Sequence, residues 1–115
     1  MKHAGGCHCG QVKFEVEMTI ESGLSCNCSI CMKRGSLLAF TPETNFKLLA
    51  GEESLTEYRF NKKSIQHKFC KACGILPFAK ATAPDGNKMV AINVRCIEGI
   101  DLGKLKITEY NGRDI

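Results

Sequence analysis

Apolar and charged side chains alternate near the start of the chain, where Val12, Phe14 and Val16 are separated by charged residues. A period of two is typical of a strand with one buried face. Further apolar or alternating runs of strand length span residues 36–40, 46–50, 55–60, 65–69, 75–81 and 89–94. Between the last two runs, Pro84-Asp85-Gly86-Asn87 is typical of a hairpin turn. The pattern predicts a mainly β domain of short antiparallel strands.

Two exceptions interrupt this pattern. Residues 29–34 are expected to form one short helix that carries Cys31, with Ser29 as its cap and Gly35 at its end. Pro77 lies inside an apolar run and cannot donate to a sheet ladder, which suggests an edge strand or a bulge at that point.

Length and charge narrow the class of protein. The chain has 115 residues, of which 43% are hydrophobic, so we expect one domain over residues 1–115. Its net charge of +4 comes from basic residues scattered singly or in pairs, and only 7% of residues are aromatic. Nucleic acid is therefore not an expected partner.

Eight cysteines in so short a chain indicate either a disulfide framework or metal sites. No apolar leader precedes Cys7, and no run has the length of a membrane span, so we expect a protein of the reducing cytoplasm. Most of the cysteines also occur as close pairs, which chelate an ion well but close too short a loop for a useful disulfide. Both observations favour zinc.

Glycine placement sorts the cysteines into two sets. A glycine directly after the second cysteine of a pair permits the tight turn of a zinc knuckle. Two pairs have such a glycine, and together they supply the four thiolates of a closed structural zinc site: Cys7, Cys9, Cys70 and Cys73.

The middle set, Cys26, Cys28 and Cys31, has no such glycine. Three protein ligands and one open position are typical of a reactive zinc, at which water or a substrate thiolate completes the coordination. The alternative is a second structural site closed by Cys96 or a histidine. Spacing alone leaves both interpretations open.

The remaining candidates are single residues. His8 lies inside a knuckle and His67 on the apolar side of an expected strand, and both are expected to be packed or hydrogen-bonded histidines rather than ligands. Cys96 is expected to be a buried small side chain, or else a reactive thiol beside Arg95.

Three ordered motifs carry a resemblance that covers nearly the whole chain: Gly5-Gly6-Cys7-His8-Cys9-Gly10, Cys26-Asn27-Cys28-Ser29-Ile30-Cys31 and Phe69-Cys70-Lys71-Ala72-Cys73-Gly74. Together they resemble the glutathione-dependent formaldehyde-activating enzymes, a family that includes the centromere protein V relatives. The segments Asn93-Val94-Arg95-Cys96-Ile97 and Tyr110-Asn111-Gly112-Arg113 resemble one bacterial branch. One departure is Asn27, where many relatives carry histidine.

The resemblance implies a β-tent fold, related to zinc ribbons, that holds two zinc ions. It implies a structural zinc on Cys7, Cys9, Cys70 and Cys73, and a catalytic zinc on Cys26, Cys28 and Cys31 that is expected to be partly empty in some preparations. The implied activity is that of a carbon–sulfur lyase resembling S-(hydroxymethyl)glutathione synthase. Its partners would be a small thiol such as glutathione and an aldehyde such as formaldehyde, without a membrane.

Two other function classes are open alternatives. One is a non-catalytic, zinc-ribbon-like module that binds nucleic acid or protein. The other is a thiol redox enzyme with Cys96 as its nucleophile, because other β-tent proteins include zinc-bearing methionine sulfoxide reductases.

Overall fold

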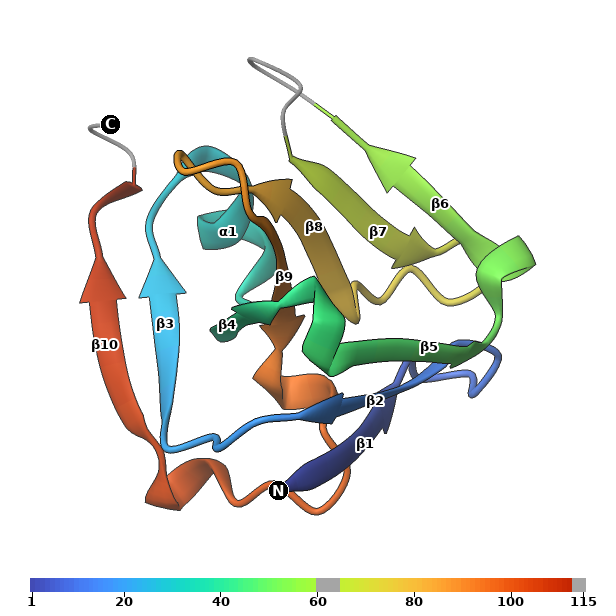
Figure 1. Cartoon of the computed structure of the whole chain (residues 1–115), viewed down its shortest axis with the longest axis horizontal. Coiled ribbons are helices and arrows are strands. Elements are labelled where there is room, and N and C mark those ends of the chain that lie inside the picture. Colours follow the sequence, from blue (N-terminus) through green and yellow to red (C-terminus); the bar gives the residue numbers. More distant parts are fainter. Residues whose placement is uncertain (60–64, 113–115) are drawn as a thin grey trace.

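The computed structural model describes residues 1–59 and 65–112, which form ten strands and one α-helix (Figure 1). The strands are β1 (Lys2–Gly6), β2 (Lys13–Glu17), β3 (Ser22–Cys26), β4 (Leu38–Pro42), β5 (Phe46–Ala50), β6 (Leu55–Tyr58), β7 (Gln66–Cys70), β8 (Phe78–Thr82), β9 (Lys88–Asn93) and β10 (Lys106–Tyr110). The helix is α1 (Ser29–Arg34), and four 3-10 turns are η1 (Glu43–Asn45), η2 (Glu52–Ser54), η3 (Val94–Cys96) and η4 (Leu102–Lys104). The prediction of a mainly β fold is confirmed.

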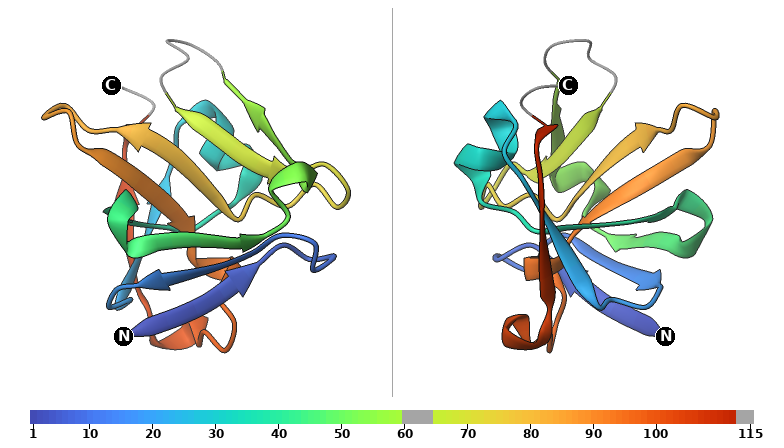
Figure 2. Two further views of the ribbon diagram at one scale, coloured as in Figure 1. Left: turned by 45° about the vertical axis from the view of Figure 1, so that its right-hand side comes forward. Right: turned by 90° about the vertical axis from the view of Figure 1, so that its left-hand side faces the viewer.

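The strands form two sheets. The small sheet has the order β1-β2-β5, and the large sheet has the order β10-β3-β4-β9-β8-β7-β6. Both views of Figure 2 place the small sheet across one end of the large one. Strands β3 and β10 pair in parallel, so the expectation of antiparallel pairing throughout is wrong for them. The long connection after β9 returns the chain to the end of the sheet at which β3 begins, so β10 runs beside β3 in the same direction.

Three phenylalanines join the two sheets. Phe14 of β2 and Phe46 of β5 have ring centroids 5.5 Å apart, and Phe46 lies 4.6 Å from Phe78 of β8. Phe14 and Phe78 are almost wholly buried. The alternation from Val12 to Val16 predicts this burial for Phe14. Burying one such ring contributes about 1.5–3 kcal/mol, and packed aromatic pairs contribute about 0.5–1.5 kcal/mol more. This cluster fixes the small sheet against the large one.

The expected strand boundaries shift by up to three residues. The run at 46–50 matches β5, whereas β4 begins at Leu38 rather than at residue 36, and residue 60 lies outside the described residues. Strand β8 begins at Phe78, directly after Pro77, and lies between β7 and β9. The expectation of an edge strand or bulge at Pro77 is therefore wrong. Because proline lacks an N–H group, the ladder starts after it, and the Pro77 carbonyl accepts a bond from Asn93 N instead.

Helix α1 has the expected bounds but not the expected cap. Cys28 takes the N-cap position with an extended backbone, and no side chain caps the helix, so the assignment of Ser29 as cap is wrong. At the other end Gly35 adopts the left-handed conformation, with a φ of 75°, and its N–H donates to the Cys31 carbonyl. The chain therefore turns sharply at Gly35, as expected from the sequence.

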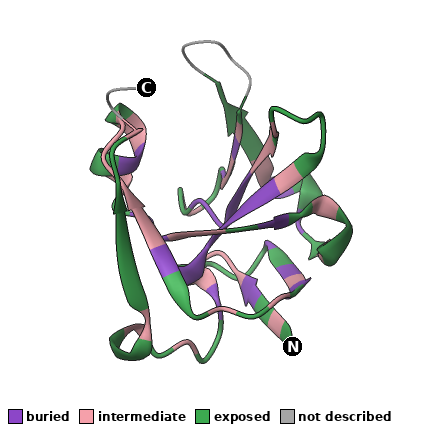
Figure 3. Ribbon diagram, turned by 60° about the vertical axis from the view of Figure 1, so that its left-hand side comes forward, coloured by how far each residue is buried: buried purple, intermediate pink, exposed green. Residues whose placement is uncertain are grey.

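The edge strands are more polar than the interior. All five residues of β10 are exposed (Figure 3).

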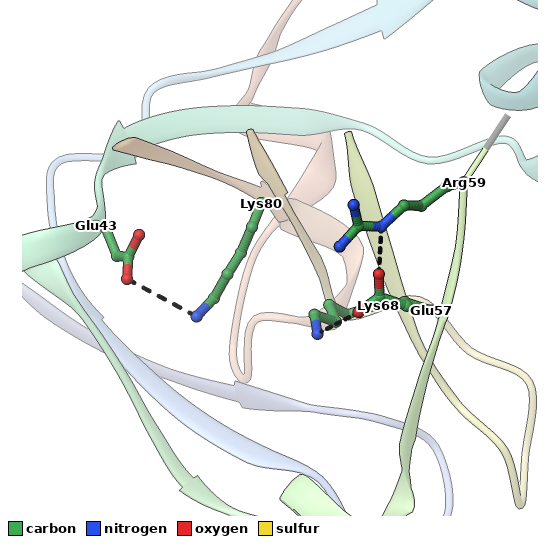
Figure 4. A network of polar contacts seen from close by, with 5 residues as sticks. All are labelled: Glu43, Glu57, Arg59, Lys68 and Lys80. Atoms are coloured by element: carbon green, nitrogen blue, oxygen red, sulfur yellow. Dashed lines mark hydrogen bonds and ion pairs between the residues drawn. The ribbon is translucent and has the colours of Figure 1, made fainter. Parts of the chain in front are cut away.

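Ion pairs lie at the opposite end of the large sheet, around β6, β7 and β8. Glu57 pairs with Arg59 and with Lys68, and the Lys68 Nζ atom lies 3.0 Å from the Glu57 carboxylate (Figure 4). Lys80 Nζ lies 3.9 Å from the Glu43 carboxylate. These basic side chains have acidic partners, so the pairs favour a solvated surface over an anion-binding one.

Candidate metal centres

Four sulfur atoms from distant parts of the chain meet at one point. Cys7 follows β1, Cys9 lies in the turn before β2, Cys70 ends β7 and Cys73 lies in the turn after it. Their Sγ atoms all lie within 4.8 Å of one another. The two pairs that the sequence grouped by their glycines therefore form one cluster, which we call the four-sulfur cluster.

The spacing within the four-sulfur cluster fits a tetrahedral zinc ion. Cys7 Sγ lies 3.5 Å from Cys9 Sγ, and Cys9 Sγ lies 3.7 Å from Cys70 Sγ. Zinc–sulfur bonds of about 2.3 Å at the tetrahedral angle place two sulfurs about 3.8 Å apart. The donor set and its geometry therefore suit a closed zinc site.

Left-handed glycines and backbone amides shape the two knuckle turns. Gly10 and Gly74 have φ angles of 85° and 80°, a left-handed conformation that residues with a side chain rarely adopt. The Val12 N–H points at Cys7 Sγ over 3.4 Å, and the Ile75 N–H lowers the pKa of Cys73 to about 6. Backbone amides aimed at sulfur stabilise the thiolate form, which is the form that binds metal.

Three further sulfurs form a second cluster, the three-sulfur cluster. Cys26 ends β3, Cys28 caps α1 and Cys31 lies in the first turn of that helix. Their Sγ atoms also lie within 4.8 Å of one another, and the Cys28 N–H points at Cys26 Sγ over 3.4 Å. The expected grouping of these three cysteines is therefore present in the fold.

No fourth side-chain ligand joins the three-sulfur cluster within residues 1–59 and 65–112. Cys96 lies instead beside the cavity that Cys7 lines, and its thiol points at the Leu76 carbonyl over 3.7 Å. Its pKa is raised to about 11, chiefly by burial, which leaves little reactive thiolate at neutral pH. In this geometry Cys96 does not close the three-sulfur cluster, and its half-buried thiol with a raised pKa does not favour the role of a nucleophile.

Crowding of three thiols makes their simultaneous ionisation costly in the absence of a cation. Burial, together with the neighbouring Cys28 and Cys26 sulfurs, raises the pKa of Cys31 to about 12. A divalent cation between the sulfurs offsets that repulsion, because the metal binds the deprotonated forms. The three-sulfur cluster therefore also suits a metal ion.

The C-terminal segment lies against the three-sulfur cluster. The Asn27 N–H donates to the Tyr110 carbonyl over 3.1 Å, and the Asn27 side chain donates to Asn111 Oδ1 over 2.9 Å. Gly112 lies so close that a Cβ atom there would be 2.6 Å from Cys26 Sγ. The tail motif suggested no such contact, which follows from the parallel pairing of β10 with β3 that sets Tyr110 opposite Cys26.

Two neighbouring cavities lie at the end of α1. One, of about 430 Å³, is bordered by Cys26 and Cys31, and the other, of about 770 Å³, is bordered by Cys7 and Arg34. Gly35 and Ser36 line both cavities. The cavity at the three-sulfur cluster therefore shares a wall with the larger cavity at the helix end, whereas sequence reasoning had assigned no role to Arg34 or Ser36.

Neither discussed histidine joins a sulfur cluster among the described residues. His8 is exposed beside the larger cavity, so its expected packing is wrong. His67 is buried on β7, and its Nδ1 atom lies 3.4 Å from Arg34 Nη1. Within the described residues, no helix has the length and apolarity needed to cross a bilayer.

The family comparison agrees with this geometry. The family model of the glutathione-dependent formaldehyde-activating enzymes matches residues 2–108. The chain belongs to this family. Its members are in general formaldehyde-activating enzymes, so the family relates this chain to glutathione and formaldehyde.

A solved structure extends the comparison to the fold. The crystal structure of a Rhodobacter sphaeroides protein is similar with a TM-score of 0.82 and 30% sequence identity, over 93% of this chain and 99% of that one. The resemblance in sequence is thus accompanied by the same arrangement of strands over nearly the full length of both chains.

Proposed function

We propose that this protein is a zinc-dependent carbon–sulfur lyase that acts on the adduct of a small thiol and an aldehyde. The observation that carries the proposal is the three-sulfur cluster, which has three cysteine ligands, no fourth side-chain ligand among the described residues, and an adjoining cavity. Three protein ligands with one open position are typical of catalytic zinc sites.

The contrast between the two clusters supports separate roles. The four sulfurs of Cys7, Cys9, Cys70 and Cys73 would fill all four positions of a tetrahedral zinc ion and leave none for a substrate. A zinc ion held by Cys26, Cys28 and Cys31 would keep one position for a substrate sulfur or oxygen. We therefore assign the four-sulfur cluster to structure and the three-sulfur cluster to the reaction.

The adduct is a hydroxymethyl thioether, such as S-hydroxymethylglutathione. In the lyase direction its carbon–sulfur bond breaks with the electron pair retained by sulfur, the hydroxyl proton leaves, and the carbon becomes the carbonyl carbon of the aldehyde. The synthase direction is the reverse. A zinc ion held by Cys26, Cys28 and Cys31 would act as a Lewis acid that stabilises the thiolate form of the substrate sulfur.

The chain's own residues hold that centre in place. Cys31 is buried on α1, and the Cys28 N–H donates towards Cys26 Sγ, so the three sulfurs are fixed by the helix start and the end of β3. The adjoining cavity of about 430 Å³ is large enough for a small thiol adduct.

A Cys28→Ser variant tests the assignment. We expect it to stay folded and to lose the accelerated exchange between formaldehyde, glutathione and their adduct, which NMR exchange spectroscopy measures. Cys96→Ser is the matched control and should keep full activity and full zinc content. If Cys28→Ser is as active as the wild type on every thiol adduct that the wild type processes, the three-sulfur cluster is not catalytic. Steeply salt-dependent oligonucleotide binding would then favour the non-catalytic module.

A further inference from the structure

Arg34, the last residue of α1, lies on the same face of the helix as Cys31 of the three-sulfur cluster. Residues three apart on a helix are neighbours on its surface, and Arg34 follows Cys31 by three positions. Arg34 is half-buried and borders the larger cavity, just beyond the Gly35–Ser36 wall that this cavity shares with the one at the three-sulfur cluster. Its guanidinium therefore lies next to the space that a bound thiol would extend into.

A neutral side chain orients this guanidinium. A guanidinium can only donate, so His67 Nδ1, 3.4 Å from Arg34 Nη1, accepts the bond. Burial, together with the Arg34 charge, lowers the pKa of His67 to about 4, so the imidazole is neutral at physiological pH. His67 thus orients Arg34 without neutralising its charge.

The Arg34 charge has no acidic partner. Within residues 1–59 and 65–112 no ion pair joins Arg34 to a carboxylate. A half-buried cation without a counter-ion carries a desolvation cost that an anionic group can offset. An anion bound at the cavity wall would therefore stabilise the Arg34 charge.

The rest of the cavity wall has the same sign of charge. Its other charged side chains are Lys13 and Arg95, which are basic, and Glu98, which is acidic. The wall thus carries three cations against one anion, and none of the four belongs to an ion pair of the described residues. Among the described residues that line the smaller cavity, by contrast, Glu109 is the one acidic or basic side chain.

We propose that Arg34, oriented by His67, binds an acidic group of the substrate whose sulfur lies at the three-sulfur cluster, and so selects anionic thiols over neutral ones. This inference rests on the function proposed above. The sulfur occupies the cavity at Cys26 and Cys31, the chain of the substrate crosses Gly35 and Ser36, and the acidic group reaches Arg34. A carboxylate suits the planar fork of an arginine, which can donate two parallel bonds to it.

A purely structural role for Arg34 makes a different prediction. Arg34 also lies in the field of Cys31 and Cys28, whose negative charges favour its charged form, although burial lowers its pKa overall. If Arg34 serves only to offset the charge of the metal-bound thiolates, its loss lowers metal content or weakens every thiol alike. If it binds substrate, its loss weakens only thiols that carry an acidic group.

The test uses the cobalt-substituted protein, whose absorption spectrum changes when a thiol sulfur binds the metal. Titrations compare 3-mercaptopropionate with 3-mercaptopropionamide, which differ in charge but hardly in size, and glutathione with its diamide. The variants are Arg34→Gln, Arg34→Lys and His67→Phe, and Lys33→Gln is the matched control because it removes a positive charge from an exposed position of the same helix. Metal content is measured for each.

We expect the wild type to bind the acidic thiol roughly tenfold more tightly than its amide in at least one of the two pairs. Arg34→Gln should lose that preference, while it binds the neutral thiol and two metal ions as the wild type does. Arg34→Lys should keep part of the preference, His67→Phe should reduce it, and Lys33→Gln should keep it. Equal binding of acid and amide by the wild type, or equal weakening of both by Arg34→Gln, overturns the proposed role of Arg34. Neither outcome contradicts the proposed lyase function. If no thiol changes the cobalt spectrum of any protein, the proposed function fails as well.

Discussion

A Cβ atom placed on Gly112 would lie 2.6 Å from the Sγ atom of Cys26, closer than such atoms approach in proteins. Gly112 does not have a left-handed backbone, so the restriction is one of space and not of backbone conformation. The C-terminal segment is therefore packed against the three-sulfur cluster so closely that a methyl group does not fit. The space around that cluster is thus limited by a residue 86 positions away from Cys26.

Gly112→Ala should weaken metal binding at the three-sulfur cluster without unfolding the protein. The added methyl group must displace either the Cys26 sulfur or the tail, and a shift of a few tenths of an ångström disturbs a coordination shell. Zinc content should fall from two equivalents towards one while the melting temperature changes little. Gly103→Ala is the control, since its Cβ atom would meet only Asp101 Oδ1, at 3.3 Å. Two equivalents of zinc in both variants would contradict the prediction.

Cys70→Ser should unfold the protein. Cys70 is wholly buried at the end of β7, and its sulfur belongs to the cluster that joins the N-terminal turn to the β7–β8 connection. A structural zinc contributes about 10–16 kcal/mol of apparent binding free energy, which is comparable to the roughly 5–15 kcal/mol net stability of a domain. Circular dichroism and the melting curve measure the loss. Cys96→Ser should keep both the fold and the zinc, and a soluble Cys70→Ser protein with a wild-type melting curve would exclude the structural assignment.

Chelators should remove the metal of the three-sulfur cluster first. Its ligands lie within six residues of one another, whereas the four-sulfur cluster ties Cys7 and Cys9 to Cys70 and Cys73 and closes a far longer loop. Metal that closes a long loop is coupled more strongly to folding, and an open site exchanges its ion more readily. A stepwise titration with EDTA should release one equivalent with unchanged circular dichroism and the second together with unfolding. Simultaneous release of both would show that the two sites are not independent.

Local sequence patterns predicted the parts of this fold that are governed by burial and by turns. The alternation around Phe14 identified β2, and Gly35 identified the end of α1, because each depends only on neighbours in sequence. The grouping of the cysteines succeeded for the same reason, since a glycine after the second cysteine marks a knuckle turn. Strands β1, β3 and β10 were missed, because they are rich in glycine and polar residues and are held by pairing with distant strands.

Contacts between distant segments explain what the sequence could not indicate at the candidate site. Arg34 and His67 are 33 residues apart and meet only because α1 lies beside β7 in the folded chain. Gly112 and Cys26 meet because β10 pairs in parallel with β3, a pairing that no local pattern encodes. The two cysteine clusters were thus predictable from motifs, whereas the residues that surround them depend on the topology of the sheet.

Acid should destabilise the wild type more than a His67→Gln variant. The pKa of His67 is lowered from 6.5 to about 4 in the folded state, so the unfolded chain binds its proton first as the pH falls. Its contribution is fully present above pH 6.5 and is lost as the pH falls towards 4, by at most about 3 kcal/mol. Glutamine can still accept from Arg34 but does not titrate. Denaturant unfolding of both proteins between pH 7 and pH 4 measures the difference, and parallel pH profiles would contradict the assignment of a neutral, buried His67.

Two buried serines allow a matched comparison of a hydroxyl that has a hydrogen-bond partner with one that has none among the described residues. Ser36 and Ser54 are 5% and 6% exposed. The Ser54 hydroxyl donates to Gln11 Oε1, whereas the Ser36 hydroxyl has no partner among the described residues. A buried hydroxyl without a partner costs about 1–3 kcal/mol, whereas a satisfied one contributes about 0.5–1.5 kcal/mol.

Ser36→Ala should therefore leave the free energy of unfolding unchanged or raise it, while Ser54→Ala should lower it by about 1 kcal/mol. Both substitutions remove one oxygen atom and leave the backbone unaltered, so the comparison isolates the hydrogen bond. Denaturant unfolding of the two variants in the absence of thiols measures the effect. If Ser36→Ala is destabilised as much as Ser54→Ala, the Ser36 hydroxyl has a hydrogen-bond partner in solution, and the prediction is wrong.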